Sequence, residues 1–334
     1  AIVHLGVASA QEFRERSLLP VAMAGIQNAK MNNGTDHPLI GFGTYKIGFV
    51  PASSNTANQP GHSPDQDPAE IIKEAIEVGY RYIDCAQFYG NEKMVGTAIK
   101  ASGVPRKDLF IASKVWGDKI YEGEDAVRQQ FERTVSDLGC EYLDLYLVHW
   151  PVPGKHVACY KVLEQLLQEG RVRAIGVSNY TIEDYQELQK EMKVKPVVNQ
   201  IEINPFLYRK KTIDFFQKEG VLLQSYRALR QGKGLDDPRI RSVAEKHGKT
   251  AAQVLGRWCV QKGIVVVAKT VKRERMLENL GVFDFTLDES DVSTLDGMTT
   301  PDTIEEYRAL YFKCIVRDTP LEKAPPEHHT VTLD

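Results

Sequence analysis

The sequence predicts a single (β/α)8 barrel with an N-terminal β-hairpin cap. Eight short runs of apolar and β-branched residues alternate with segments whose apolar residues recur at spacings of three and four. The chain has 334 residues, of which 42% are hydrophobic and 26% charged, enough apolar sequence to bury one large core. An open doubly wound sheet also alternates strands with helices, but it rarely needs so many units and normally has a phosphate-binding loop after its first strand.

The predicted strands are short and rich in Val, Ile, Leu and Tyr. They cover residues 40–47, 80–86, 109–115, 143–150, 174–179, 197–203, 221–227 and 264–270. Gly41-Phe42-Gly43 in the first run could open a dinucleotide fingerprint, but Lys46 stands where the third glycine belongs and no helix follows directly. The first strand therefore carries no Rossmann signature, which favours the closed barrel.

We expect one domain over residues 1–334. Its parts are an extension at residues 1–28, the barrel at 29–300 with an insertion at 49–66, and a tail at 301–334. Asn33-Gly34 predicts the turn of the hairpin cap, and Asp67-Pro68 predicts the start of a helix after the polar, Pro- and Ser-rich insertion. Prolines and charges near the C-terminus predict a loosely held tail.

Charge and composition favour small-molecule chemistry in the cytoplasm. The formal net charge of -3, with interspersed signs, creates no strong field for nucleic acid or an anionic membrane. No apolar run approaches the roughly 18 residues that span a bilayer, and charges interrupt the opening segment too early for a signal peptide. The five cysteines are odd in number and lack a CxxC pair, which favours reduced thiols. We expect a cytoplasmic monomer with neither a nucleic-acid nor a membrane partner.

Polar and aromatic side chains follow the C-terminal ends of consecutive predicted strands, where barrels carry their active sites. They are Asp84, Tyr89, Lys114, Trp116, His149, Trp150, Ser178, Asn179, Gln200, Tyr226 and Lys269. Taken singly, each has a structural explanation: Asp84 and Lys114 form a buried ion pair, His149 is a core histidine, and the aromatic residues pack. So many polar groups at one end of a barrel are hard to attribute to packing, so the sequence predicts a site there.

Four of these residues suit proton transfer to a carbonyl group. A tyrosine has a pKa of about 10, holds its proton at neutral pH, and has this pKa lowered by a nearby cation. We expect Tyr89 to donate the proton, Lys114 to lower its pKa, Asp84 to hold Lys114, and His149 to orient the carbonyl oxygen or assist in proton transfer. The eight histidines show no paired ligand spacing on strand ends, and Lys114 beside Asp84 would oppose a cation, so we expect no metal site.

From the first strand to Phe285 the sequence resembles the aldo-keto reductases. GYRYIDCAQFYGNE (79–92) carries the family's aspartate and tyrosine, IASKVW (111–116) its lysine and LDLYLVHWP (143–151) its histidine. The resemblance implies reduction of an aldehyde or ketone, with hydride from NADPH and a proton from Tyr89. Relatives that reduce conjugated carbon–carbon bonds carry glutamate in place of His149, which favours carbonyl reduction.

The resemblance also implies a cofactor site. In it, Ser178, Asn179 and Gln200 bind the nicotinamide carboxamide, and Tyr226 stacks on the ring. The full set that it implies is Gly43, Thr44, Tyr45, Asp84, Ser178, Asn179, Gln200, Tyr226, Arg227, Leu229, Lys269, Thr270, Val271, Arg275, Glu278 and Asn279.

The segment VVAKTVKRERMLENL (266–280) resembles the family's adenosine-phosphate segment. Lys269, Thr270 and Arg275 suit the extra phosphate of NADPH, and Glu278 and Asn279 suit the adenine, so NADPH is preferred over NADH. Taken alone, this basic run fits a solvated helix face. Its place after the eighth strand, a common phosphate site in barrels, favours the cofactor.

The resemblance implies an aromatic substrate pocket, which Tyr311 or Phe312 of the tail could close. Its residues are Tyr45, Phe88, Tyr89, Trp116, His149 and Trp150. The pattern does not choose among sugars, methylglyoxal-like aldehydes, quinones, prostanoids and steroids. The alternative function is an NADPH-binding sensor or structural barrel with weak catalysis.

The sequence departs from the family in three loops. Arg227-Ala228-Leu229-Arg230 replaces the family's serine-proline-leucine-glycine, and we expect both arginines to bind the cofactor pyrophosphate. The loop at residues 151–156 is short where many relatives have a flap. Residues 49–66 leave from the same end of the barrel, so we expect them to lie beside the mouth as a lid.

Overall fold

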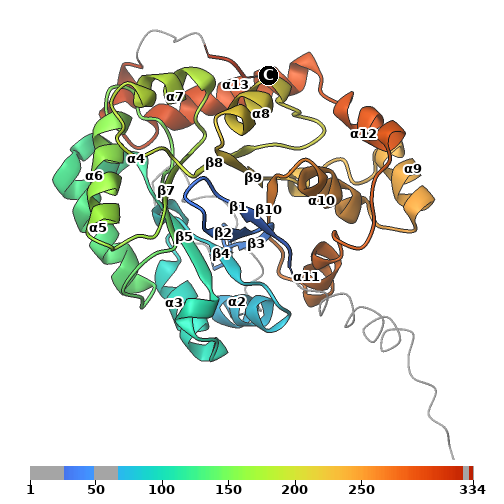
Figure 1. The fold of residues 1–334 in the computed structure, drawn as a ribbon, viewed down its shortest axis with the longest axis horizontal. Helices are drawn as coiled ribbons and strands as arrows, with labels where there is room; N and C mark the ends of the chain where they lie inside the picture. The colour runs from blue at the N-terminus through green and yellow to red at the C-terminus, as the bar shows by residue number, and fades with distance from the viewer. Residues whose placement is uncertain (1–25, 49–66, 326–330, 334) are drawn as a thin grey trace, which may run out of the picture.

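The computed structural model describes residues 26–48, 67–325 and 331–333. In this part, eight parallel strands pair in chain order and β10 closes the barrel on β3 (Figure 1). They are β3 (Ile40–Gly43), β4 (Tyr82–Asp84), β5 (Phe110–Val115), β6 (Leu145–Val148), β7 (Ile175–Ser178), β8 (Val198–Glu202), β9 (Leu222–Tyr226) and β10 (Val265–Ala268). The predicted (β/α)8 fold is confirmed, although each strand is shorter than its apolar run because the ends of the runs leave the sheet.

A β-hairpin lies across the N-terminal end of the barrel, directly before β3 (Figure 1). Its strands β1 (Asn28–Lys30) and β2 (Asp36–Pro38) pair antiparallel. The turn between them contains Gly34 at a φ of 83°, a left-handed conformation that glycine adopts without steric cost. The cap predicted from Asn33-Gly34 is therefore present.

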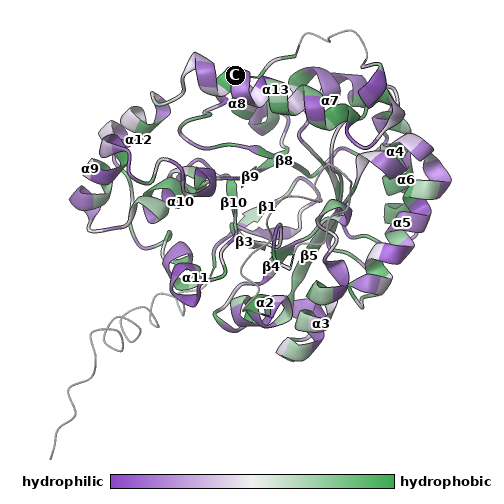
Figure 2. Cartoon of the chain, turned by 180° about the vertical axis from the view of Figure 1, so that it is seen from behind, coloured by the Kyte–Doolittle hydropathy of each residue, from purple (hydrophilic) through white to green (hydrophobic). Residues whose placement is uncertain are grey.

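Helices surround the barrel, and most carry both hydrophobic and hydrophilic residues (Figure 2). They are α2 (Pro68–Glu77), α3 (Glu92–Ser102), α4 (Gly117–Glu122), α5 (Glu124–Asp137), α6 (His156–Gln168), α7 (Ile182–Gln189), α8 (Lys210–Lys218), α9 (Pro238–His247), α10 (Ala251–Gln261), α11 (Arg273–Leu280), α12 (Glu289–Asp296) and α13 (Pro301–Val316). The predicted start of α2 is confirmed: the Asp67 side chain accepts a hydrogen bond from the Ala69 amide at 2.8 Å.

The C-terminal segment is more ordered than its composition predicts. The expectation of a loosely held tail is wrong for residues 301–316, which form α13, and Tyr307, Tyr311 and Cys314 on this helix are buried. Pro301 opens the helix at a position that needs no amide hydrogen. The apolar side chains stabilise α13 because they pack on the barrel, and the prolines beyond it do not interrupt it.

Most of the predicted extension at residues 1–28 lies outside the described residues, which begin at residue 26. The predicted insertion at residues 49–66, which we expect to be a lid, lies wholly outside them. Among the helices that the structure describes, none has the length and apolar character to cross a bilayer. The same residues bring together no three His, Cys, Asp or Glu side chains that would hold a metal ion. All five cysteines are free thiols, as the sequence predicts.

Candidate active site

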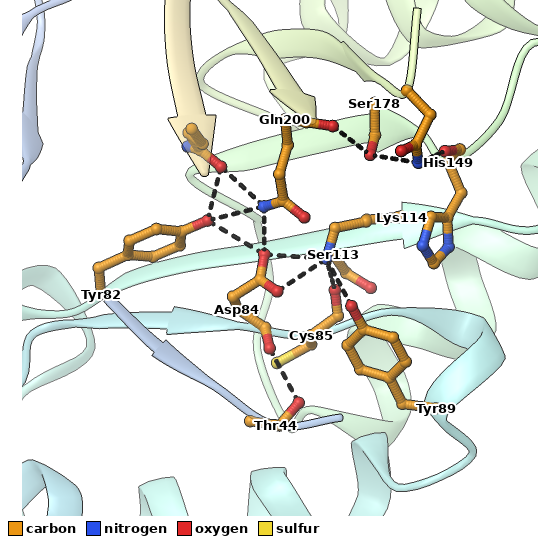
Figure 3. Close-up of polar contacts among 12 residues, drawn as sticks. Thr44, Tyr82, Asp84, Cys85, Tyr89, Ser113, Lys114, His149, Ser178 and Gln200 are labelled. Atoms are coloured by element: carbon orange, nitrogen blue, oxygen red, sulfur yellow. Dashed lines mark hydrogen bonds and ion pairs between the residues drawn. The ribbon is translucent and has the colours of Figure 1, made fainter. Parts of the chain in front are cut away.

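A buried ion pair lies at the centre of the C-terminal end of the barrel (Figure 3). Asp84 ends β4 and Lys114 is the penultimate residue of β5, and both side chains point into the barrel. Lys114 Nζ lies 2.8 Å from Asp84 Oδ1 and 2.9 Å from Oδ2, and donates another hydrogen bond to Cys85 O at 2.8 Å. The side chains are 0% and 3% exposed, so each charge needs the other to remain ionised.

Tyr89 places its hydroxyl beside this ion pair. It ends the short 3-10 helix η2 (Gln87–Tyr89), after which Gly90 turns the chain with a φ of 65°. Lys114 Nζ donates a hydrogen bond to Tyr89 Oη at 3.2 Å, so the proton of the hydroxyl points away from the ammonium group. This arrangement leaves the hydroxyl proton available to another acceptor.

Burial, and then the negative charge of Asp84, raise the pKa of Tyr89 well above its usual value. The expectation that Lys114 lowers this pKa towards neutrality is therefore wrong for this structure. Removing water from around the phenol disfavours its charged form, and the charge of Asp84 adds to this effect. Tyr89 consequently holds its proton throughout the neutral pH range.

His149 follows β6 and lies edge-on to the aromatic rings of Phe88, Tyr89 and Trp116. Its ring centroid is 5.9 Å from that of Tyr89 and 4.9 Å from that of Trp116. Burial, and then the charge of Lys114, lower the pKa of His149 well below its usual value, so the imidazole is neutral at pH 7. Its buried Nδ1 has no hydrogen-bond partner among the described residues. A neutral imidazole donates from one nitrogen only, which suits it to orient an uncharged oxygen.

Aromatic rings surround the Tyr89 hydroxyl, as the sequence predicts. Phe88 and Trp116 stack with centroids 4.0 Å apart, and Tyr45 lies 5.1 Å from the Tyr89 ring. Trp150 belongs to the same apolar cluster as Phe88 and Trp116. These side chains give the mouth of the barrel an apolar lining.

The C-terminal segment adds to this lining. Tyr311 on α13 packs against Trp150 with ring centroids 6.1 Å apart. After the helix, Asp318 Oδ2 accepts a hydrogen bond from Trp116 Nε1 at 2.8 Å. The sequence pointed to Tyr311 but gave no signal for Asp318, because its contact depends on how the segment folds back over the barrel.

The four residues predicted to surround a nicotinamide lie next to one another. Ser178 ends β7 and donates to Gln200 O at 2.8 Å, and Asn179 donates to His149 O at 3.0 Å. Tyr226 ends β9 and donates from its hydroxyl to Asn179 Oδ1 at 2.7 Å. Gln200 differs from the other three because it lies within β8 and reaches Asp84 Oδ1 at 2.8 Å. Asn179 has a φ of 61°, a left-handed conformation rare outside glycine and asparagine.

A model of the aldo/keto reductase family matches residues 39–299, which contain all four predicted catalytic residues. The chain belongs to the aldo-keto reductase family. It is 38% identical over 275 residues to glyoxal reductase of Bacillus subtilis, covering 82% of this chain and 94% of the relative. The family is one of oxidoreductases that act on small carbonyl compounds, and the predicted resemblance is confirmed.

Solved structures of aldo-keto reductases share the fold. The Brucella melitensis enzyme is 35% identical with a TM-score of 0.72, covering 82% of this chain and 99% of its own. The enzyme AKR2E5 of the silkworm Bombyx mori is 31% identical with a TM-score of 0.75, covering 83% and 88%. A structure of AKR2E5 complexed with NADPH is also known.

In this aldo-keto reductase, two of the predicted cofactor residues near β3 contact the neighbouring strands β4 and β10. Thr44 donates from its hydroxyl to Asp84 O at 2.8 Å. A Cβ atom on Gly43 would lie 3.2 Å from the Val267 side chain of β10, so the close approach of the two strands favours glycine. Tyr45 follows at the mouth of the barrel and is partly exposed.

The predicted phosphate segment follows β10. Lys269 is half-buried, and burial and then the charge of Lys46 lower its pKa to about 8. Two like charges at this place indicate a site suited to an anion. Of the other predicted residues in this segment, Thr270 is buried and Val271 is partly buried. The last three lie on α11, where Arg275 is exposed, Glu278 is partly buried and Asn279 is buried.

The loop after β9 places its arginines against acidic side chains. Arg227 Nη1 lies 3.0 Å from Glu202 Oε2, and Arg230 Nη2 lies 3.8 Å from Glu306 Oε2. The Arg230 guanidinium also covers the ring of Phe206 at 4.6 Å. Leu229 between them is partly buried. Pyrophosphate binding by both arginines stays a prediction, and it requires the phosphates to compete with these partners.

Sequence reasoning missed three buried polar residues below Asp84, namely Tyr82, Gln224 and His37. A period-two signal was available, since Tyr82 and Gln224 each stand two residues before a predicted site residue on the same strand. No such signal existed for His37, which lies on β2 of the hairpin cap and approaches the barrel only in the tertiary fold.

Proposed function

We propose that this protein reduces aldehydes or ketones to alcohols with NADPH in the cytoplasm, where free thiols persist. The Tyr89 hydroxyl carries the proposal. It holds its proton, accepts a hydrogen bond from a buried lysine and lies within an apolar lining beside neutral His149. A protonated phenol next to a carbonyl carbon that accepts a hydride is the arrangement that carbonyl reduction requires.

The residues at the barrel mouth fit such a cofactor. Ser178, Asn179 and Gln200 offer amide and hydroxyl groups beside the ion pair, and His149 Nδ1 is a buried nitrogen without a partner among the described residues. After β10, the charges of Lys269 and Lys46 interact, and such a pair of cations suits a phosphate group. NADPH, when bound, would supply the hydride.

In the proposed reaction, the substrate carbonyl oxygen lies between Tyr89 Oη and the His149 ring. His149 donates a hydrogen bond that orients this oxygen, and Tyr89 Oη gives up its proton as negative charge develops there. Lys114 stabilises the resulting phenolate, and Asp84 keeps Lys114 charged in the apolar interior. The aromatic lining excludes water and strengthens each of these interactions.

The substrate class is tested by a panel of aldehydes, ketones and sugars with NADPH and with NADH, followed by cofactor absorbance. We expect turnover of small aldehydes with NADPH, and weaker turnover with NADH because the cations near Lys269 have no extra phosphate to bind. Binding of NADPH without consumption over the whole panel would instead support the sensor or structural barrel.

The role of Tyr89 is tested by Tyr89→Phe, which keeps the ring and removes the proton donor. We expect kcat to fall by about 100-fold or more while NADPH affinity stays within about twofold. Tyr160→Phe is the matched control, since it also removes a buried hydroxyl, one that donates to Val194 O at 3.1 Å, far from the site. Near-normal turnover of Tyr89→Phe would remove Tyr89 from the mechanism.

A further inference from the structure

We propose that Tyr82, Gln224 and His37 form a hydrogen-bonded column inside the barrel that positions the Asp84 carboxylate for catalysis. The inference rests on the reduction proposed above. Tyr82 belongs to β4, Gln224 to β9 and His37 to β2 of the hairpin cap, and none of the three side chains is exposed to solvent. They act as positioning residues, because none of them lies at the barrel mouth.

The upper part of the column ends on Asp84. Tyr82 Oη lies 3.0 Å from Asp84 Oδ1 and 3.0 Å from Gln224 Oε1. Gln200 Nε2 lies 2.8 Å from the same two oxygens. Figure 3 shows Tyr82 reaching Asp84 from the side opposite to Tyr89. Asp84 is therefore held by Lys114 on the substrate side and by two neutral donors from within the barrel.

The lower part of the column fixes the direction of every hydrogen bond. His37 Nδ1 lies 2.8 Å from Pro38 O, which can only accept, so Nδ1 carries the ring proton. His37 Nε2 must then accept from Gln224 Nε2 at 2.7 Å, which turns Gln224 Oε1 towards Tyr82 and Gln200. Burial lowers the pKa of His37 to about 4, in agreement with a neutral ring.

These hydrogen-bond directions determine which groups donate to Asp84. The amide of Gln200 has two hydrogens, one for Gln224 Oε1 and one for Asp84 Oδ1. The Tyr82 hydroxyl therefore directs its single proton to the charged carboxylate, the stronger of its two acceptors. Tyr82 of the column and the neighbouring Gln200 thus both donate to Asp84 Oδ1, which fixes the position of the carboxylate beside Lys114.

Packing prevents the Tyr82 ring from moving away. A Cβ atom on Gly41 would overlap this ring, so β3 packs directly against Tyr82. The His37 and Phe110 rings pack edge-on against it, with centroids 4.7 Å and 5.4 Å away. Confinement on these sides fixes the position of the hydroxyl to which Asp84 is bound.

The test compares kcat and KM of Tyr82→Phe with those of the parent enzyme. The variant keeps Lys114 and Tyr89 and removes one of the two neutral donors that hold the Asp84 carboxylate. Asp84 then holds Lys114 less firmly beside the Tyr89 hydroxyl, so we expect kcat to fall by about tenfold while KM and NADPH affinity stay within about twofold.

A second variant and a second measurement keep the test decisive. Gln224→Met removes the acceptor of Gln200 while keeping the length of the side chain, and we expect kcat to fall by about threefold. Tyr160→Phe is again the control and should leave kcat and KM unchanged. A purely structural column would lower the Tm of both test variants and leave their kcat within about twofold of the parent value, and that result would overturn the proposal.

A readout independent of turnover separates this inference from the proposed function. In a crystal structure of Tyr82→Phe, we expect the Asp84 carboxylate and the Lys114 ammonium group to be displaced from their positions in the parent, because one donor to Asp84 is lost. If the parent reduces no carbonyl compound but this displacement appears, the proposed function fails and the column stands. If the parent is active and neither kcat nor the position of the carboxylate changes in the variant, the column fails alone.

Discussion

At the scale of single residues, burial decides the chemistry of the site. Lys114 and Asp84 are both removed from water, and each would be unstable as an ion without the other. The same burial keeps Tyr89 protonated and His149 neutral, because it disfavours the charged form of each group. One physical cause therefore sets the protonation states that proton donation to a carbonyl oxygen needs.

A stability measurement can separate the ion pair from the catalysis. Lys114→Met leaves the Asp84 charge buried without its partner, so we expect a loss of about 3–5 kcal/mol in the free energy of unfolding, measured in urea. Adding Asp84→Asn removes that charge and should recover at least half of the loss, while kcat stays about 100-fold or more below the parent. No recovery in the double variant would mean that Lys114 stabilises the fold by packing alone.

At the scale of elements, two connecting segments, the loop after β9 and the segment after α13, shape the barrel mouth. In the loop after β9, Arg227, Arg230 and Gln231 all have positive φ angles, 53°, 45° and 57°. Residues other than glycine rarely adopt this backbone conformation. Each such residue costs on the order of 1 kcal/mol or more of folding free energy, and it persists only where its surroundings hold it. The contacts of the arginines with Glu202 and Glu306 provide that support.

This geometry sharpens the prediction for the cofactor. If the arginines bind the pyrophosphate, Arg227→Ala and Arg230→Ala should each weaken NADPH binding by about tenfold, measured by fluorescence titration. Arg128→Ala is the matched control, because it removes an arginine paired with Glu169 on the outer surface. Unchanged affinity in both loop variants would exclude the arginines from the cofactor site.

The segment after α13 makes a separate prediction about the substrate. Asp318 holds the Trp116 indole, and its φ of 61° is one that glycine adopts freely. Asp318→Gly should raise KM for bulky carbonyl compounds several-fold because Trp116 loses its anchor, and should leave kcat for the smallest aldehydes nearly unchanged. An equal change in kcat for small and bulky substrates would show that Asp318 acts on the whole fold instead.

At the scale of the whole molecule, buried titratable groups make stability depend on pH in two opposing ways. Burial lowers the pKa of His37 from 6.5 to about 4, so the unfolded chain binds more protons between these values and stability falls on acidification. Burial raises the pKa of Glu92 from 4.5 to about 7, so stability in an overlapping interval falls as pH rises. The parent protein shows only the sum, to which neutral His149 adds in the direction of His37.

Two variants resolve this sum. His37→Gln keeps an acceptor for Gln224 but does not titrate, so it should lose less stability than the parent between pH 7 and pH 4.5, by about 3 kcal/mol at most. Glu92→Gln removes the opposing group and should lose more than the parent over the same interval. Urea unfolding at several pH values measures both, and slopes equal to that of the parent would contradict the linkage.

The sequence by itself determined the barrel and the hairpin cap, and it pointed to the four residues that the fold brings together as the proposed catalytic centre. Its strands alternate with amphipathic helices, and the motifs at the strand ends are local, so they are visible without the fold. The position of α13 was not predictable, because its stability depends on packing against the barrel and not on composition.

Only the tertiary structure decided the electrostatics. The direction of the Tyr89 pKa follows from how much water the fold removes, which no local spacing reports. The column from His37 to Asp84 joins residues far apart in the chain, and the closed barrel alone brings β2, β4 and β9 to a common interior. Candidate catalytic residues can be recognised from their local sequence pattern. Their protonation states depend on burial and on neighbouring charges, which only the complete fold establishes.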